Sequence, residues 1–297
     1  MQTTLDVSIH TPSGATLEEV TPLPNEFYPP EGGGFKPELV SDKDTDERQA
    51  LLQRRFGGLE RLYGRAGAAQ IRAAHVAVVG IGGVGSWAAE ALARSGVGQL
   101  TLIDLDHIAE SNLNRQIHAL DSTIGQAKVQ AMRERIAHIH PDCMVNCIED
   151  FVEPANWPGI LPPGVDAVID ACDQIHAKTA MAAWARQQRR LFISVGAAGG
   201  KRHAHKVDID DLAHTTHDPL LAQLRYRLRK QYGAPREGKK IGVACVFSRE
   251  AVAPPDASCA LEGGDGSLNC HGYGSVVAVT ATFGQCAAGW VLEQLSK

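Results

Sequence analysis

Short apolar runs alternate with longer amphipathic stretches through the middle of the 297-residue chain. The first run, HVAVVG at 75–80, is almost continuously apolar, which is typical of a parallel strand covered on both faces. Similar runs predict strands over 99–104, 143–148, 165–171 and 191–196. The stretches between them predict helices over 84–95, 125–138 and 175–188. This alternation predicts an α/β fold, a Rossmann-like, mostly parallel sheet with helices on both faces.

The pattern changes beyond residue 200, where we expect a C-terminal α+β extension of the same domain. Residues 218–233 (DPLLAQLRYRLRKQYG) predict a basic amphipathic helix, and residues 243–248 predict a further strand. Residues 272–292 carry no charged side chain and are long enough to span a membrane. Because threonines, a glutamine and several glycines interrupt that segment, we expect a buried packing helix over 272–295 and keep membrane association as the alternative.

Composition separates the first 50 residues from the rest. They hold six of the 15 prolines, and ten Asp/Glu against three Lys/Arg, which is a net charge of −7. Since the whole chain carries −5, residues 51–297 sum to about +2 by subtraction. We therefore predict a flexible acidic, Pro/Gly-rich extension over 1–50 and one folded domain over 51–297. The charge of that domain is compatible with a nucleic-acid partner.

The seven cysteines are odd in number and form no C-x-x-C pair. This usage favours free thiols in a reducing compartment over a disulfide framework, and it argues against a structural zinc site. The N-terminal MQTTLDVSIHTPSG lacks the basic and then apolar order of a secretory signal. We therefore expect a cytoplasmic protein.

A glycine-rich turn follows the first predicted strand. Gly80, Gly82, Gly83 and Gly85 in GIGGVG permit a tight turn, and the helix that follows offers unpaired N–H groups to a phosphate. Asp104, at the end of the next strand, is placed to accept hydrogen bonds from ribose hydroxyls. The turn alone fits NAD as well as ATP. A nicotinamide-dependent oxidoreductase, an ATP-using enzyme and a non-catalytic nucleotide-binding scaffold are therefore three open interpretations.

Polar residues behind the turn favour ATP. Asn112, Arg115 and Lys128 bring an amide and two cations toward the same pocket mouth. Asp170 and Asp173 flank the end of a later strand in VIDACDQ. Hydride transfer has no need of such a cluster, whereas attack on the α-phosphorus of ATP builds charge on the phosphoryl oxygens and on departing pyrophosphate. Cations and a Mg²⁺ ion held by a carboxylate stabilise that charge, so we expect ATP and Mg²⁺ as cofactors.

These motifs are similar to those of one enzyme superfamily. The glycine turn, LIDLD, SNLNRQ, GQAK and VIDACDQ resemble the ubiquitin-activating-enzyme-like adenylyltransferases, which include the ThiF, MoeB and HesA types. The resemblance extends over residues 55–200 and covers the predicted nucleotide core over 73–200. The combination of SNLNRQ with a downstream G-x-x-K is the specific part of the match.

The resemblance implies a role for each residue of the ATP site. It implies that Gly83 lies against the phosphates and that Asp104 binds the ribose. By the same resemblance, Asn112 and Arg115 bind the triphosphate and Lys128 polarises the region of the α-phosphate.

The same resemblance implies a metal ligand and a homodimer. Asp173 would hold Mg²⁺. Arg61 in ERLYG would match an arginine that the family contributes across a dimer interface, with Arg55 as the competing candidate. The implied catalytic set is Arg115, Lys128, Asp173 and Arg61.

Within the superfamily, the chain most resembles the subfamily that dehydrates threonylcarbamoyladenosine in tRNA. RFGGLERLYG, NRQIHAL and ACVFSREA carry this likeness through nearly the whole chain after residue 55. It implies ATP-dependent adenylation of the threonyl carboxylate beside the anticodon, followed by intramolecular ring closure. It also suggests a cysteine desulfurase partner, with Cys245 as a possible sulfur acceptor. Lys239, Lys240 and Arg249 are near in the sequence and could lower the pKa of this thiol, whereas a small half-buried strand residue is the ordinary interpretation.

A basic segment follows the nucleotide core, and we expect residues 214–249 to face the tRNA. Phosphate contacts would come from Arg225, Arg227, Arg229, Lys230, Lys239 and Lys240. A solvated helix face is the ordinary interpretation of such a run. The main alternative function is an adenylyltransferase that activates the C-terminus of a ubiquitin-like sulfur-carrier protein, and the basic segment and the lack of paired cysteines count against it.

Overall fold

The computed structural model describes residues 42–236, 238–256, 258 and 273–297. The chain divides into two units, residues 1–46 and 47–297. Most of the extension predicted over 1–50 lies outside the described residues. The first helix, α1 (Asp42–Ala73), begins inside that range and is broken at Gly64, where φ is 73° and ψ is 166°.

In the described part of the second unit, seven strands form one sheet. They are β1 (His75–Val79), β2 (Gln99–Ile103), β3 (Met144–Ile148), β4 (Ala167–Asp170), β5 (Leu191–Val195), β6 (Val207–Asp211) and β7 (Ala244–Ser248). Their order across the sheet is β3-β2-β1-β4-β5-β7-β6. Neighbouring strands run parallel except β6, which pairs antiparallel with β7 at the edge. The predicted mostly parallel α/β sheet, with its C-terminal extension in the same domain, is confirmed.

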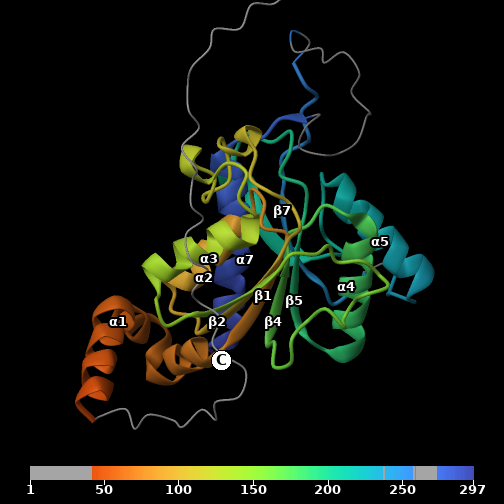
Figure 1. The fold of residues 1–297 in the computed structure, drawn as a ribbon. Coiled ribbons are helices and arrows are strands. Elements are labelled where there is room, and N and C mark those ends of the chain that lie inside the picture. The colour runs from red at the N-terminus through yellow and green to blue at the C-terminus, as the bar shows by residue number, and fades with distance from the viewer. Residues whose placement is uncertain (1–41, 237, 257, 259–272) are drawn as a thin grey trace, which may run out of the picture. The chain divides into compact units, whose positions relative to one another are not determined.

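Helices cover both faces of the sheet (Figure 1). One face carries α2 (Gly85–Arg94), α3 (Lys128–Ile139) and α7 (Val277–Leu295), and the other carries α4 (Ile175–Gln188) and α5 (Pro219–Gln231). The alternation of side chains along β1 serves both layers, because Val76 and Val78 pack with α2 and α7 while Ala77 and Val79 pack with α4. This double burial explains why the strands are almost continuously apolar.

The last helix, α7, packs closely against α2. Val279, Phe283, Ala287 and Val291 are fully buried along one side of it. A Cβ at Gly284 would overlap the carbonyl oxygen of Val84, so the glycine permits the close approach of the two helices. The apolar segment that suggested a membrane span therefore supplies the cover of one sheet face. Among the described helices, none combines the length and the apolar character needed to cross a bilayer.

Helix α5 is amphipathic and has a strong start. The Asp218 side chain caps it by accepting a hydrogen bond from the Leu221 amide at 2.9 Å, and proline occupies the first helical position. The leucines at 220, 221, 224 and 228 are buried, and the basic side chains lie between them in the sequence.

Short 3-10 helices lie in two of the described connections. The helices η1 (Glu110–Asn112) and η2 (Asp121–Thr123) lie between β2 and α3, and η3 (Ala204–Lys206) precedes β6.

The turn between β1 and α2 depends on glycine at two positions. Gly80 has a φ of 85°, and a Cβ there would lie 2.9 Å from the backbone nitrogen of Cys172. A Cβ at Gly85 would overlap the carbonyl oxygen of Gly80, whereas a Cβ at Gly82 would meet nothing within 4 Å. Gly80 and Gly85 therefore shape the turn, and Gly82 leaves room beside it.

We predict that Gly85→Ala lowers the free energy of unfolding by about 3 kcal/mol, because backbone atoms on both sides of the overlap must shift. Gly82→Ala is the matched control and should change the free energy of unfolding by less than about 0.5 kcal/mol. Urea denaturation followed by far-UV circular dichroism measures both values. Equal stability of the two variants would contradict the assignment of the turn to Gly85.

Candidate functional site

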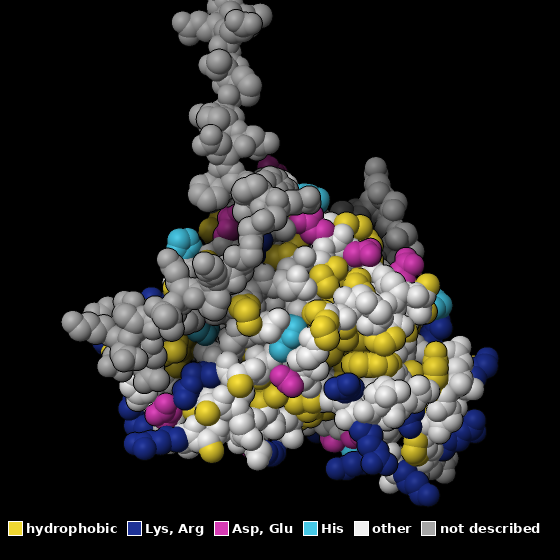
Figure 2. Space-filling model, turned by 60° about the horizontal axis from the view of Figure 1, so that its bottom comes forward, with side chains coloured by type: hydrophobic (Ala, Val, Ile, Leu, Met, Phe, Trp, Pro, Cys, Tyr) yellow, Lys and Arg dark blue, Asp and Glu magenta, His cyan; other side chains and the backbone are white. Residues whose placement is uncertain are grey.

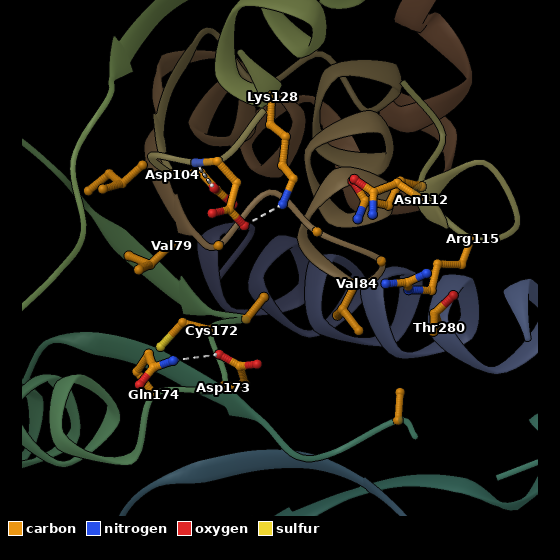
Figure 3. A pocket seen from close by; sticks show the side chains of 18 of the residues that line it. Val79, Val84, Asp104, Asn112, Arg115, Lys128, Cys172, Asp173, Gln174 and Thr280 are labelled. Atoms are coloured by element: carbon orange, nitrogen blue, oxygen red, sulfur yellow. Dashed lines mark hydrogen bonds and ion pairs between the residues drawn. The ribbon is translucent and has the colours of Figure 1, made fainter. Parts of the chain in front are cut away.

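A pocket of about 500 Å³ opens at the carboxyl ends of the parallel strands. The residues that follow β1, β2, β4 and β5 line it. The chain proceeds from β1 through β2 to β3 on one side and returns through β4 and β5 on the other, so the pocket lies where the strand order reverses. Open α/β sheets bind nucleotides at such a point. Figure 3 shows side chains from both halves of the sheet directed into this pocket.

The glycine turn forms one wall of the pocket. Gly82 and Gly83 line the pocket, while Gly85 lies behind it under the first turn of α2. A Cβ at Gly83 would lie 3.2 Å from the Arg115 side chain, so the absence of a side chain lets that arginine lie across the turn. The turn therefore offers backbone to a ligand at Gly82 and Gly83.

Asp104 holds the glycine turn in place. Its side chain is 8% exposed, and its two oxygens accept hydrogen bonds from the Ile81 amide at 2.6 Å and from the Asp106 amide at 2.9 Å. Burial raises the pKa of Asp104, and Lys128 and the two backbone donors act in the opposite direction. Each carboxylate oxygen has a second acceptor position, so these bonds leave capacity for ribose hydroxyls.

Lys128 reaches the pocket from the first residue of α3. It is 6% exposed, and its Nζ donates to Asp106 Oδ2 at 2.7 Å. An ammonium has three N–H donors, so this ion pair leaves donors for a ligand. The Asp106 side chain is half exposed, and it fixes Lys128 without enclosing it.

Asn112 and Arg115 form the adjoining part of the wall (Figure 3). Asn112 Oδ1 accepts from the Ala109 amide at 3.1 Å, which secures the side chain by its oxygen and leaves the NH₂ group as the available donor. Arg115 Nη1 donates to the Ser111 carbonyl at 2.7 Å and to Asn114 Oδ1 at 2.9 Å. Asn112 is thus held through its acceptor oxygen and Arg115 through part of its donor capacity, so both keep donors for a ligand.

Asp173 enters from the side of the pocket formed by β4 (Figure 3). It is exposed, and its side chain accepts a long hydrogen bond of 3.4 Å from Gln174 Nε2. No group of three or more His, Cys, Asp or Glu side chains suited to a metal ion occurs in the part of the chain that the structure describes. Mg²⁺ at nucleotide sites commonly takes one or two carboxylates together with phosphates and water, and a weakly engaged Asp173 fits that coordination.

A buried ionic cluster beneath the pocket was not identified as such from the sequence. Lys178 and Asp170 are both fully buried and their side chains are 2.8 Å apart. Ser194 donates to Asp170 Oδ2 at 2.7 Å, and Lys178 also donates to the Val195 carbonyl at 2.9 Å. Burial alone would lower the pKa of Lys178, but Asp170 raises it above its ordinary value. An acid at the end of a buried strand needs a partner, and that requirement is the signal that could have located Lys178.

Cys172 lies in the pocket next to this cluster. Its Sγ donates to Asp170 Oδ1 at 3.1 Å. Burial and the Asp170 carboxylate raise the pKa of the thiol well above its ordinary value, so it is poorly suited to act as a nucleophile.

The arginines proposed to act across a dimer do not line this pocket. Arg61 is exposed on α1, and Arg55 donates to the Ile139 carbonyl at 2.8 Å. Neither residue lies in the pocket of its own chain.

The structure contradicts the expected activation of Cys245. Its side chain is fully buried in the middle of the sheet on β7. Burial raises the pKa of the thiol well above its ordinary value. Desolvation outweighs the basic residues that are near in sequence, since Lys239, Lys240 and Arg249 are exposed. The ordinary interpretation of Cys245 as a packed strand residue is therefore confirmed, and the activated thiol is not. Two of the seven cysteines, Cys259 and Cys270, lie outside the described residues.

The predicted tRNA-facing residues differ in how freely they are presented. Lys230, Lys239 and Lys240 are exposed. Arg225 instead donates to the carbonyls of Leu212 and Thr215 at 2.9 and 3.0 Å, and Arg229 donates to the Pro235 carbonyl at 3.1 Å. On the side of the molecule that carries α4 and α5, Figure 2 shows Lys and Arg side chains gathered at the margin.

Comparisons with known proteins agree with this geometry. The ThiF family model matches residues 54–297. The tRNA threonylcarbamoyladenosine dehydratase of Escherichia coli (strain K12) is 44% identical over 251 residues, which cover 82% of this chain and 94% of that protein. The tRNA threonylcarbamoyladenosine dehydratase of Haemophilus influenzae is 43% identical over 249 residues with the same coverage. The crystal structure of the E. coli dehydratase in complex with ATP has a TM-score of 0.74 at 41% identity and covers 86% of this chain and 96% of that one.

We predict that Lys178→Met lowers the free energy of unfolding by roughly 3 kcal/mol or more, because it leaves the Asp170 carboxylate buried without its counter-charge. The double variant Asp170→Asn/Lys178→Met removes both charges and should recover part of that loss. Urea denaturation of these two variants, of Asp170→Asn alone and of the unchanged protein measures the coupling. A Lys178→Met variant within about 1 kcal/mol of the unchanged protein would show that the pair is not the support we describe.

Proposed function

The chain belongs to the ThiF family, and within that family we propose that it acts as an ATP-dependent tRNA threonylcarbamoyladenosine dehydratase. The observation that carries this function is the convergence of Asp104, Asn112, Arg115, Lys128 and Asp173 on one pocket at the strand-order reversal. The relatives that this chain matches over more than nine-tenths of their length carry that name.

ATP binds with its ribose at Asp104 and its phosphates between the glycine turn and the cationic wall. The backbone at Gly82 and Gly83 approaches the phosphates because no side chain stands in the way. Asn112 and Arg115 donate to the triphosphate, and Lys128 donates near the α-phosphate. Asp173 would hold Mg²⁺, which when bound supplies positive charge to the phosphate oxygens.

The reaction needs a positioned carboxylate more than it needs an enzyme nucleophile. The threonyl carboxylate attacks the α-phosphorus, pyrophosphate leaves, and an acyl-adenylate forms. A neighbouring nucleophile of the same nucleoside then closes the ring and displaces AMP, so the oxygen that is lost leaves with AMP and the net change is loss of water. Lys128 and Arg115 stabilise the charge that develops in the first step. The raised pKa values of Cys172 and Cys245 agree with a mechanism that uses neither thiol.

A homodimer is part of this proposal. We assign Arg61 to the phosphates of a partner's pocket because its motif ERLYG resembles the one that contributes such an arginine in the family, and because its side chain is exposed. Arg55 is the less suitable candidate, because its guanidinium already donates to the Ile139 carbonyl.

The tRNA surface that we propose is narrower than the basic segment of the sequence. Lys230, Lys239 and Lys240 present their ammonium groups to solvent, and we assign the phosphate contacts mainly to them and to Arg227. Arg225 and Arg229 bind backbone carbonyls and act first as supports of α5. The proposal includes a cytoplasmic location, where tRNA and ATP are both available.

A role of Cys245 as a sulfur acceptor from a cysteine desulfurase receives no support from its surroundings. Sulfur transfer requires an accessible thiolate. The Cys245 thiol is fully buried, and burial raises its pKa well above the ordinary value. We therefore leave sulfur transfer out of the proposed function.

The alternative is an enzyme of the same chemistry that activates the C-terminus of a ubiquitin-like sulfur-carrier protein. It would use the same ATP residues with a different acceptor. Exchange of labelled pyrophosphate into ATP distinguishes the two functions. Modified tRNA should stimulate the exchange if the protein is a dehydratase, and a carrier protein should stimulate it if the alternative is correct.

We predict that Lys128→Ala and Asp173→Asn each slow AMP formation on modified tRNA by about 100-fold or more, because each removes one contact to charge that develops on the phosphates. Lys206→Ala is the control, since Lys206 is exposed and outside the pocket, and it should retain normal turnover. AMP release from purified protein measures the rates.

The substrate is checked in the same experiment series. Cells without the gene should contain the open nucleoside in their tRNA by mass spectrometry. The cyclised form should return with the unchanged gene and not with Lys128→Ala. Cyclised nucleoside in the absence of the gene would refute the dehydratase function while leaving ATP binding intact.

We predict that Lys239→Ala/Lys240→Ala weakens tRNA binding and reduces the slope of log K against log salt by about one for each lysine–phosphate interaction removed. Arg133→Ala, an exposed cation on α3, is the charge control and should leave the slope unchanged. Filter binding at several salt concentrations measures both. An unchanged slope in the double variant would remove these lysines from the tRNA surface.

A further inference from the structure

A second pocket is formed by residues that take no part in the nucleotide site. It has a volume of about 690 Å³ and is lined by residues of α1, the end of α2, the second half of α3 and the loop over 118–123. The two pockets have no lining residue in common. Three arginines line the second pocket, Arg55 from α1, Arg94 from α2 and Arg135 from α3. The proposed reaction uses none of them.

A buried carboxylate holds two of these guanidinium groups in place. The side chain of Glu90 is only 3% exposed, and its Oε1 accepts a hydrogen bond from Arg94 Nε at 2.7 Å. Its Oε2 accepts from Arg135 Nε at 2.7 Å, and Oε1 also accepts from Arg135 Nη2 at 3.2 Å. Because a guanidinium has five N–H donors, both arginines keep donors for a ligand.

The third guanidinium and the balance of charge also favour an anion. Arg55 Nη1 donates to the Ile139 carbonyl at 2.8 Å, which fixes the side chain and leaves its other donors available. Glu134 is the carboxylate among the lining residues, and it is exposed and accepts from Gln126 Nε2 at 2.8 Å. Three guanidinium groups therefore stand against two carboxylates, those of Glu90 and Glu134, and one positive charge is in excess.

A buried imidazole in the same pocket has no hydrogen-bond partner. His118 lines the pocket and is 2% exposed, and neither of its ring nitrogens has a partner among the described residues. Burial lowers the pKa of His118 to about 4, and the charges of Lys128 and Arg135 act in the same direction. The ring is therefore uncharged at neutral pH and carries one N–H donor. Because buried polar groups almost always have a partner, this donor points to a ligand that accepts hydrogen bonds.

Guanidinium groups bind the oxygens of phosphates and carboxylates. Here the donors come from three helices and one loop, and a tetrahedral phosphate accepts hydrogen bonds from several directions whereas a carboxylate is planar. We propose that this second pocket binds a phosphate group through its three arginines and the N–H of His118. The phosphate belongs either to the backbone of tRNA or to a free phosphate compound, and the two sources are distinguished below.

The test follows the histidine signals of the full-length protein by NMR during titration with inorganic phosphate at constant ionic strength. Phosphate should move the signals of His118 and of His138, which also lines the pocket. Arg55→Gln/Arg94→Gln removes two exposed arginines, leaves Arg135 to pair with Glu90, and should weaken phosphate binding at least about tenfold. Signals that do not respond to phosphate, or that respond equally in the double variant, overturn the proposal.

Two controls locate the binding. Arg133→Gln changes an exposed cation of α3 outside both pockets and should bind phosphate as the unchanged protein does. Arg115→Ala removes a cation of the nucleotide pocket and should leave the response of the His118 signal intact. Loss of that response in Arg115→Ala would place the phosphate in the nucleotide pocket and overturn the proposal.

His118→Phe separates a role in binding from a role in packing. It keeps a ring in the same place and removes two unpartnered nitrogens, so the melting temperature should be unchanged or higher. Phosphate binding, followed by the signal of His138, should nevertheless weaken about 3- to 10-fold, because one donor is lost. Unchanged phosphate binding in this variant overturns the role of His118, and if the double arginine variant does not fold, this result decides alone.

Filter binding of tRNA at several salt concentrations identifies the source of the phosphate. A slope of log K against log salt that falls by about one to two in Arg55→Gln/Arg94→Gln assigns the site to the tRNA backbone. An unchanged slope, together with phosphate binding by the unchanged protein, assigns it to a free phosphate compound. Because the readout is phosphate binding in a separate pocket, failure here leaves the dehydratase function untouched, and a lack of AMP formation leaves this site untouched.

Discussion

The hydrogen bond from the Ile81 amide to the Asp104 carboxylate sets the geometry on which the pocket depends. It ties the turn after β1 to the end of β2, so two neighbouring strands present their carboxyl ends as one surface. Gly85 can then lie directly over the Gly80 carbonyl, and α2 begins at a fixed place. Helix α7 packs against the start of α2 at Gly284, so the position of α2 also fixes the position of α7 on the sheet.

The two sides of the pocket have different origins and different chemistry. The connection between β2 and α3 supplies Asn112 and Arg115, and the first residue of α3 supplies Lys128. All three are donors held in position by hydrogen bonds. The exits of β4 and β5 supply Asp173 and a backbone segment, and these rest on the buried Asp170–Lys178 pair. A nucleotide between them meets donors on one side and a carboxylate with its support on the other. The carboxylate of Asp173, which accepts a long hydrogen bond from Gln174, therefore lies on the opposite side of the pocket from Lys128, whose ammonium is paired with Asp106.

Sequence reasoning located those parts of the site that are written in short, contiguous motifs. The glycine turn, Asp104 and the Asn112 to Lys128 cluster each lie within one strand and its following loop. The buried cluster around Lys178 depends on partners that are distant in the sequence, and no local pattern specifies it. For Cys245 and Arg225 the nearby sequence was misleading. Burial in the sheet decides the state of the Cys245 thiol, and backbone carbonyls use the Arg225 guanidinium.

The edge strand β6 has a consequence for self-association. Its sequence, VDIDD, places aspartates at 208, 210 and 211 on the last strand of the described sheet. Asp208 pairs with Arg249, Asp210 contacts His214, and Asp211 accepts from the amides of Ile241 and Gly242. A copy of this strand added alongside would still place an acidic edge against an acidic edge, which disfavours the pairing. Fibril-like stacking through this margin is thereby discouraged by three acidic side chains that lie away from the nucleotide pocket.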